Sequence, residues 1–444
     1  MARRLSGLSR SIELALMLAM VSACGSRGSS LSKVEGDGAI PDVTPPPANG
    51  PRLGAIANAT PVLERPTANA RWIGALHAGA LVPRSENALR KSKECEAGYY
   101  PVFPRGVVCL NQGATLDLSH PTLAAMAIQP ALEQPLPYTY GRVRKDGALY
   151  ERDPARPDGV RETQKLPRGS AMAVVGSWTA RIGDGETERF GLLTNGRFVR
   201  ASELEAARGS SFSGYAIDAE HELPVAFVVK RGVSNFKFDG DRIAKDEPLE
   251  YHQIIPLGGK NKNYNQSKIW AVDDEHWLRE QDVTIVHRRL RYPDFAKDGV
   301  RWLDVSVICN TLVAYEGKKP MFATLVSTGR DRVLDNPPPD AAVTKLGTFE
   351  IANKHVTWLG APPERAGERY SLFDLPWAIE LTSGQALLGA YWHDRFGVER
   401  GPGDIALSPA DARWVFDFVG PELPKSWHEA AADPNQKTFV VVHK

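Results

Sequence analysis

Short apolar runs separated by turn-forming residues dominate the middle of the chain. Residues 72–82, 173–180 and 225–229 are examples, and Gly, Pro, Asp and Asn lie between such runs. Short runs bounded by turn formers are typical of β-strands. We therefore predict a β region over residues 69–290.

Two stretches inside this region repeat one pattern. Residues 191–204 read GLLTNGRFVRASEL and residues 270–283 read WAVDDEHWLREQDV. Each has apolar residues, a turn, an aromatic residue, an aliphatic-Arg pair and an acidic-aliphatic end. The pattern resembles the last hairpin of bacterial SH3-like modules, and residues 72–82 resemble an early strand of another copy. We predict small SH3-like β-barrel modules, two in number, and the alternative is one irregular β domain.

The pattern changes near residue 296. Residues 300–329 predict two or three strands joined by a turn at 316–318. A later helix is predicted to begin after Ser408, which suits the N-cap, with Pro409 in the first helical position and Asp411 in the first turn. Its apolar stripe is formed by Ala412, Val415, Phe416 and Val419. We predict a mainly β fold with short helices for residues 296–444.

The N-terminus has the pattern of an export signal. A basic start is followed by an apolar run over residues 14–21, too short to span a bilayer, and then by small residues before Cys24. Residues 21–24 resemble a bacterial lipobox, which implies a signal peptide over 1–23 and lipidation of Cys24. Gly25 implies the periplasmic face of the outer membrane. The alternative is an ordinary cleaved signal peptide. Residues 24–68 are rich in Pro and Gly and predict a disordered tether.

Charge and cysteine content bear on which binding partners, disulfides and metals the chain can have. The 444 residues suit two or three domains, and 54 Lys and Arg against 53 Asp and Glu give no electrostatic argument for nucleic acid. In an exported protein Cys95 and Cys109 predict a disulfide. No ligand-spaced partner for a metal lies nearby, so we predict no metal and no cofactor. Cys309, within an apolar run, is predicted to be a buried small hydrophobe.

Three blocks in the last third of the chain carry a family resemblance. Leu312, Tyr315 and Gly317 form a Leu-x-x-Tyr-x-Gly hairpin pattern, residues 326–329 read VSTG, and residues 344–351 read TKLGTFEI. The blocks resemble the start of the L,D-transpeptidase (YkuD-type) domain, the cysteine enzymes that cross-link bacterial peptidoglycan. The resemblance implies an L,D-transpeptidase-type β fold over residues 296–444.

The same resemblance locates the family's catalytic positions in this chain. The His-Gly pair reads Leu388-Gly389, and the Ser-His-Gly-Cys block reads Gly401-Pro402-Gly403-Asp404. The family reaction requires a thiolate that attacks the stem peptide and a histidine that transfers the proton. Because Leu388, Pro402 and Asp404 replace both histidines and the cysteine, we predict that no catalytic residue remains.

Binding is the activity that such a scaffold retains. By resemblance, Trp377, Tyr391, Trp392 and His393 belong to segments that border the peptide groove, so they are candidates for contacts with substrate. The alternative for Trp377 is packing beneath the groove, and for His393 a surface turn.

The sequence therefore predicts an envelope lipoprotein that acts in peptidoglycan organisation. It would bind stem peptides or glycan, or regulate active cell-wall enzymes, without catalysis of its own, and contact the membrane through its lipid only. One alternative is an active transpeptidase or peptidoglycan hydrolase with a rearranged site. Another is a structural tether between the outer membrane and the wall.

Overall fold

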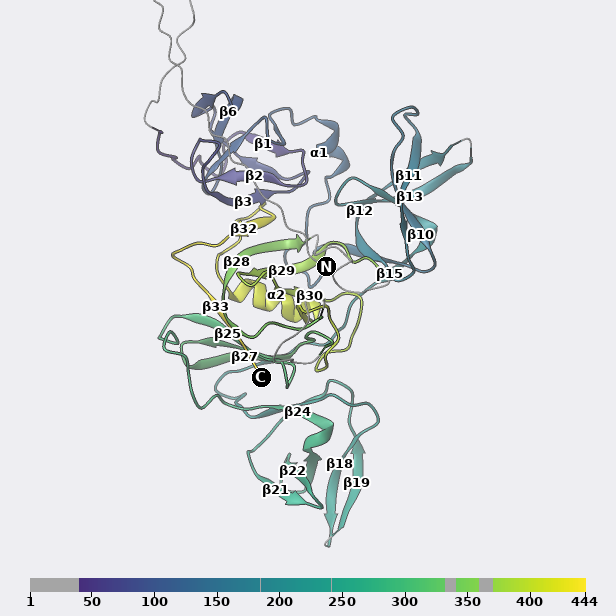
Figure 1. Ribbon diagram of the computed structural model, residues 1–444, viewed down its shortest axis with the longest axis vertical. Coiled ribbons are helices and arrows are strands. Elements are labelled where there is room, and N and C mark those ends of the chain that lie inside the picture. The colour runs from purple at the N-terminus through teal and green to yellow at the C-terminus, as the bar shows by residue number, and fades with distance from the viewer. Residues whose placement is uncertain (1–39, 184, 241, 332–340, 359–369) are drawn as a thin grey trace, which may run out of the picture. The chain divides into compact units, whose positions relative to one another are not determined.

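The computed structural model describes residues 40–183, 185–240, 242–331, 341–358 and 370–444 (Figure 1). The predicted signal peptide and Cys24 lie outside these residues. Residues 40–444 form one compact unit. Within the described ranges, no helix has the length and apolar character needed to cross a membrane. The unit is built from strands with few and short helices, which confirms the prediction of a mainly β chain.

The first part of the unit is a set of short antiparallel strands followed by one helical turn. β6 and β7 form a hairpin in which the predicted disulfide joins Cys95 to Cys109. The elements are β1 (Arg52–Ala55), β2 (Thr60–Leu63), β3 (Trp72–Leu76), β4 (Leu81–Pro83), β5 (Arg90–Ser92), β6 (Cys95–Pro101), β7 (Val107–Cys109), β8 (Ala114–Thr115) and α1 (Pro121–Ala125).

β1 and β2 correct one prediction. Both strands lie inside residues 24–68, so the predicted disordered tether is wrong for this part of the chain. β1 pairs with β4 and β8, and β2 pairs with β3 and β7. Composition alone does not predict these strands. A few apolar residues, among them Leu53 and Val62, are enough for a strand once neighbouring strands complete its hydrogen bonds and its core.

A seven-stranded sheet follows, in the order β11-β10-β14-β13-β12-β9-β15. β11 also pairs with β12, so the sheet closes on itself. Its elements are β9 (Thr139–Val143), β10 (Gly147–Arg152), β11 (Gly159–Leu166), β12 (Ala171–Ile182), β13 (Thr187–Leu193), β14 (Phe198–Arg200), the 3-10 helix η1 (Ala201–Glu203) and β15 (Leu204–Ala207).

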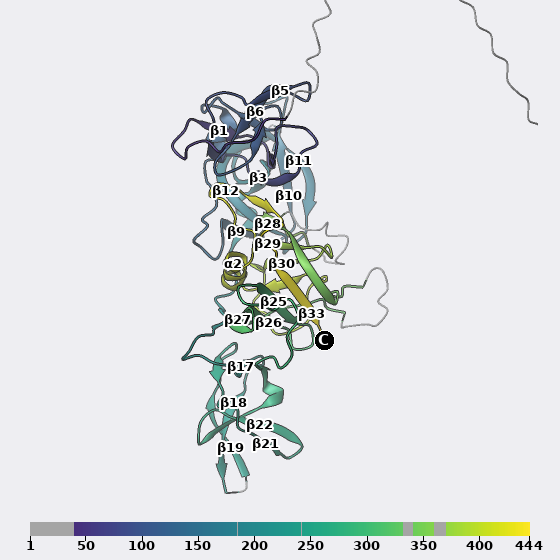
Figure 2. The ribbon, with the colours of Figure 1, turned by 90° about the vertical axis from the view of Figure 1, so that its left-hand side faces the viewer.

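The next strands form two smaller sheets with their own hydrophobic cluster around Trp270 and Leu278 (Figure 2). Their elements are β17 (Val225–Val228), β18 (Ser234–Asp239), β19 (Arg242–Pro248), β20 (Ile254–Pro256), β21 (Asn261–Tyr264), β22 (Ser267–Ala271), β23 (His276–Arg279), η2 (Glu280–Asp282) and β24 (Val283–Val286).

The internal repeat read from the sequence has a structural counterpart. Residues 191–204 span the end of β13, β14, η1 and the start of β15, and residues 270–283 span the end of β22, β23, η2 and the start of β24. Both copies therefore have the order strand, strand, 3-10 helix, strand. The assignment of these regions to SH3-like modules stays a prediction.

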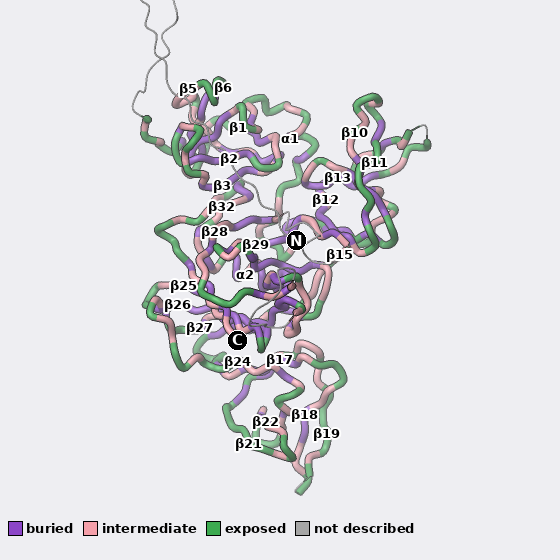
Figure 3. Tube along the Cα trace, viewed as in Figure 1, coloured by how far each residue is buried: buried purple, intermediate pink, exposed green. Residues whose placement is uncertain are grey.

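The last third of the chain contributes strands to the fifteen-stranded sheet, and many of their residues are buried (Figure 3). β25, β26 and β27 are a meander whose second turn has Gly317 at φ 58°, so the three predicted strands and their turn are present. β33 runs parallel to β25 and pairs with β28 on its other side. The strands are β25 (Arg301–Ser306), β26 (Thr311–Glu316), β27 (Lys319–Leu325), β28 (Gly347–Trp358), β29 (Leu375–Leu381), β30 (Ala386–Gly389), β31 (Ile405–Leu407), β32 (Glu429–Ala431) and β33 (Phe439–His443).

This sheet reaches beyond the predicted boundary at residue 296. β16 (Tyr215–Ala216) pairs with β27, and β32 pairs with β3 of the first region. A continuous path of paired strands thus runs from the C-terminal region into the N-terminal one. Such pairings between distant segments carry no local sequence signal.

The predicted helix is α2 (Pro409–Phe418). Ser408 is its N-cap, and the Ser408 hydroxyl accepts a hydrogen bond from the Asp411 backbone N–H at 3.1 Å. The predicted apolar stripe is buried in a cluster with strands β29, β30 and β31. Helix and strands together fix the segment that precedes β31, where the family resemblance places the catalytic block.

Candidate active-site region

The blocks that carry the resemblance meet in space, although they are far apart in the sequence. Ser327 pairs with Ala406, and Gly329 pairs with Gly401. The Thr344 hydroxyl donates to the Gly403 carbonyl at 2.9 Å and accepts from the Gly329 N–H at 2.8 Å. One side chain thus connects all three segments. We call residues 401–404, with their neighbours on β30 and residues 326–329, the candidate active-site region.

The resemblance predicts Asp404 at the position of the family nucleophile. Its side chain is half-buried, and Oδ1 accepts a hydrogen bond from the Ala386 N–H at 2.9 Å. Burial raises the pKa of Asp404 to about 6, although the hydrogen bond from Ala386 lowers it. The carboxylate therefore joins the segment to β30 through Oδ1.

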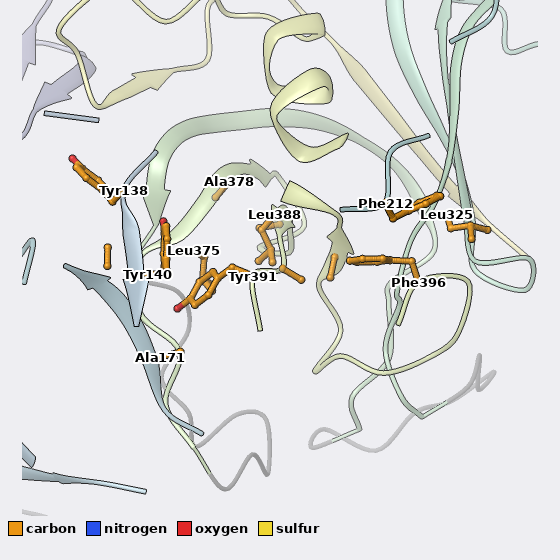
Figure 4. Close-up of a cluster of buried hydrophobic side chains, with 14 of the residues drawn as sticks. Tyr138, Tyr140, Ala171, Phe212, Leu325, Leu375, Ala378, Leu388, Tyr391 and Phe396 are labelled. Carbon is orange, nitrogen blue, oxygen red and sulfur yellow. The ribbon is translucent and has the colours of Figure 1, made fainter. Parts of the chain in front are cut away.

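Leu388, which the resemblance predicts at one of the family's histidine positions, lies on β30 beside the parallel strand β31. It is 3% exposed and lies in a cluster that includes Leu375, Ala378 and Tyr391 (Figure 4). A side chain in this position has no group that exchanges a proton, and its burial leaves no access for substrate.

Pro402 and Gly403 shape the backbone of the same segment. Pro402 is exposed and has no N–H to donate. Gly403 adopts φ +128°, and a Cβ there would lie 2.8 Å from the Val343 carbonyl oxygen, so only glycine fits. The Gly403 carbonyl also accepts a hydrogen bond from the Gln385 side chain at 2.5 Å. The resemblance did not point to Gln385, which has no motif signal in the sequence.

His393 remains half-buried in the loop that follows β30. Its Nδ1 accepts a hydrogen bond from the Arg395 N–H at 3.2 Å. Burial lowers the pKa of His393 to about 3, and the nearby Arg400 and Arg395 lower it further, against Asp394. Asp394 itself pairs with Arg231 at 3.1 Å. His393 is thus a neutral ring, and its Nδ1 lone pair is engaged in the loop.

Two of the four groove candidates face the core. Trp377 is 1% exposed, donates its indole N–H to the Pro135 carbonyl at 2.6 Å and packs edge-on against Phe416. Tyr391 is 2% exposed, and its hydroxyl donates to the Phe373 carbonyl at 2.7 Å. The groove assignment is wrong for both, because each aromatic ring is buried and its polar group is satisfied by a backbone carbonyl. Trp392 stays partly exposed and retains its candidate role.

The prediction for Cys309 is also wrong. β25 ends at Ser306, and Cys309 lies exposed in the turn that leads to β26. Its neighbour Asn310 accepts a hydrogen bond from the Thr328 hydroxyl at 2.7 Å. The apolar run was read as one strand, but Asn310 at φ 52° closes a turn within it.

Among the residues that the structure describes, no group of three or more His, Cys, Asp or Glu side chains is arranged to hold a metal ion. The candidate active-site region therefore offers hydrogen-bonding groups, one half-buried carboxylate and an aromatic ring at its border.

Comparison with known proteins finds a relative over part of the chain. No family model matches the chain. The chain is 25% identical over 143 residues to "Putative L,D-transpeptidase YciB" of Bacillus subtilis, a match that covers 30% of this chain and 68% of that protein. This chain is similar to an L,D-transpeptidase over part of its length.

Solved structures give further L,D-transpeptidase matches. One from Stackebrandtia nassauensis matches with TM-score 0.23 and 18% identity, covering 34% of this chain and 60% of that one. One from Xylanimonas cellulosilytica matches with TM-score 0.23 and 16% identity, covering 34% and 64%. One from Mycobacterium tuberculosis matches with TM-score 0.24 and 15% identity, covering 43% and 77%. The chain spans less than two thirds of the first two.

Proposed function

We propose that this protein is an exported relative of the L,D-transpeptidases that binds peptidoglycan without catalysing its cross-linking. One observation carries the proposal. The positions of the family's nucleophile and histidines hold Asp404, Pro402 and Leu388, and two of these side chains are part of the fold. The scaffold is kept where the chemistry is absent.

The chemistry argues against a substitute nucleophile at this position. Attack by the Asp404 carboxylate on an amide would produce an anhydride, a high-energy intermediate, and would need a general acid to protonate the leaving amine. His393 has its Nδ1 engaged by Arg395 and a pKa lowered to about 3, so it holds no proton to deliver near neutral pH.

The proposed cellular location rests on the similarity to L,D-transpeptidases. An L,D-transpeptidase acts on peptidoglycan, so a cell-envelope site suits this chain. We propose that Cys24 carries the lipid, that the tether begins there, and that the outer membrane holds the anchor. The seven-stranded sheet and the two smaller sheets that follow it are proposed to be SH3-like modules that contribute contacts with stem peptides, glycan or an active cell-wall enzyme.

Binding is tested by co-sedimentation with purified sacculi. We expect the full chain to be retained, and Trp392→Ala to reduce retention about tenfold, since stacking aromatics contribute on the order of 1–3 kcal/mol. Phe103→Ala, which removes a partly exposed ring from the N-terminal region, serves as the matched control and is expected to leave retention unchanged. Absence of the wild-type protein from the pellet would rule out the binding proposal.

Catalysis is tested separately with muropeptides that carry tetrapeptide stems, followed by mass spectrometry. We expect neither new cross-links nor shortened stems. The rival, an enzyme with a rearranged site, has one structural point in its favour. The Cys309 thiol is exposed next to Asn310, which contacts Thr328, and the Thr328 carbonyl accepts from the Gly401 N–H at 2.8 Å. Products that vanish in Cys309→Ala or Asp404→Ala would establish the rival.

A third function is purely mechanical, a tether between the outer membrane and the wall. Deletion would then weaken the envelope and leave the muropeptide profile unchanged. The sacculus assay separates this case. A tether would still be retained by sacculi, but Trp392→Ala would not be expected to reduce its retention.

A further inference from the structure

A cavity of about 300 Å³ lies where the first β region meets the segment between β32 and β33. Arg71 and Arg105 line it from the first region, together with Glu64. Asp433 and Asn435 line it from the other side. The cavity is separate from the candidate active-site region, since residues 401–404 are not among those that line it.

Arg71 is held by contacts within the fold. It forms a two-pronged contact with Glu64, at 2.9 and 3.4 Å, and its Nη1 donates to the Ala432 carbonyl at 3.1 Å. This guanidinium joins the first region to the C-terminal strands and has few donors left for a ligand.

Arg105 is different, because most of its donors are unused. Nη1 makes one long contact with Asp433 Oδ2 at 3.4 Å. Nε is buried and, among the described residues, has no acceptor. The guanidinium lies 6.0 Å from the centre of the Trp427 ring, which limits its movement. Because Nε is buried, a ligand in the cavity reaches the guanidinium through its Nη atoms, and a carboxylate is the group that pairs with them best.

The charges on the cavity wall define the rest of the ligand. Two guanidinium groups are balanced by the Glu64 and Asp433 carboxylates. A simple anion would be attracted to Arg105 but repelled by the neighbouring carboxylate of Asp433, whose side chain is only 16% exposed. A ligand that carries both charges satisfies both, with its carboxylate on Arg105 and its ammonium on Asp433 or Glu64.

We propose that this cavity binds a small zwitterion of the peptide type, through the free carboxylate and free ammonium of the ligand. The volume lies at the lower end of the range of ligand sites, which suits an amino acid or a dipeptide rather than a longer chain. Because opposite walls belong to the first β region and to the β32–β33 connection, the ligand joins these two parts of the fold. The proposal does not depend on the proposed function.

The test is calorimetric titration of the full chain with alanyl-alanine as the probe. Two blocked probes, N-acetyl-alanyl-alanine and alanyl-alanine amide, each lack one charge. We expect saturable binding of alanyl-alanine and at least tenfold weaker binding of each blocked probe, since a hydrogen bond to a charged group is worth about a factor of ten or more.

Matched variants identify the cavity. Arg105→Gln is expected to weaken alanyl-alanine binding at least tenfold. Arg65→Gln removes the same charge from an exposed residue that does not line the cavity, and binding should stay within about twofold. Unchanged circular dichroism and thermal midpoint of Arg105→Gln show that the fold is intact, and Asp433→Asn gives a second, independent loss.

Three results would overturn the proposal. The first is no saturable binding of alanyl-alanine up to about 10 mM. The second is equal binding of the blocked probes, or of acetate, which would replace a zwitterion by a simpler ligand. The third is equal binding by Arg105→Gln and the wild type, which would place any site elsewhere. Sacculus retention has no bearing on any of them.

Discussion

Replacement of both Cys95 and Cys109 by serine is expected to lower the free energy of unfolding of the first β region by about 3 kcal/mol. The disulfide closes a loop with a sequence separation of 14 between β6 and β7. In the chain-entropy description, the loss of such a cross-link frees the unfolded chain by about that amount. Both sulfur atoms are also buried in one small cluster with Tyr99 and Val107, where two serine hydroxyls would lack the surrounding apolar contacts.

Amide hydrogen exchange in β2, β6 and β7 measures this effect locally, which matters because a chain of several β regions need not unfold in one step. Cys309→Ser is the matched control. It removes an exposed thiol, and a change within about 0.5 kcal/mol is expected. Reductant should weaken the wild type and leave the double serine variant unaffected. Identical exchange in the wild type and the double variant would show that the hairpin is held by its strand pairing alone.

Local patterns in the sequence predicted local structure well. The turn at Gly317 and the N-cap at Ser408 follow from neighbours within a few residues, and the partners Cys95 and Cys109 are only 14 residues apart. The pairings of β3 with β32 and of β16 with β27 could not be predicted. The first pair of strands lies several hundred residues apart in the sequence, and the second about a hundred. The start of the folded region was missed for the same reason, since β1 depends on β4 and β8.

The candidate site shows the same division. The motif blocks located the segments that meet around Thr344, because the resemblance fixed their order in the chain. The resemblance could not predict the orientation of individual aromatic rings. Trp377 and Tyr391 were expected at a groove, yet their polar atoms bond to the Pro135 and Phe373 carbonyls, which come from other segments. Which way an aromatic ring points is decided by partners that the motif does not contain.

A buried carboxylate connects the seven-stranded sheet to β29. Asp374 is 3% exposed, and its side chain accepts hydrogen bonds from the Thr194 hydroxyl at 2.5 Å and the Ala173 N–H at 3.1 Å. Its own carbonyl accepts from the Tyr140 hydroxyl at 2.8 Å. Burial raises the pKa of Asp374 to about 6 from 3.8, against the lowering effect of the two hydrogen bonds. The fold therefore binds a proton at this site more tightly than the unfolded chain does.

The free energy of unfolding of the wild type is expected to fall relative to that of Asp374→Asn as pH rises. An acid with a raised pKa in the fold contributes its full stability below 3.8 and loses it as pH rises through about 6. At 1.36 kcal/mol per pKa unit, the difference amounts to about 3 kcal/mol between pH 3 and pH 7.5. Asparagine keeps one acceptor oxygen and carries no charge at any pH, so it removes this dependence.

The difference in unfolding free energy between the two proteins isolates Asp374, because the other titrating groups are common to both. Asp274→Asn, at a side chain that is 97% exposed, is the matched control and should differ from the wild type by a constant amount over the same range. Asp374→Ala separates the charge from the hydrogen bonds, since the Ala173 N–H and the Thr194 hydroxyl then lose their acceptor at every pH. If Asp374→Asn follows the wild type at each pH, the carboxylate is solvated in the fold, and the contact between the seven-stranded sheet and β29 must open to water more often than its hydrogen bonds imply.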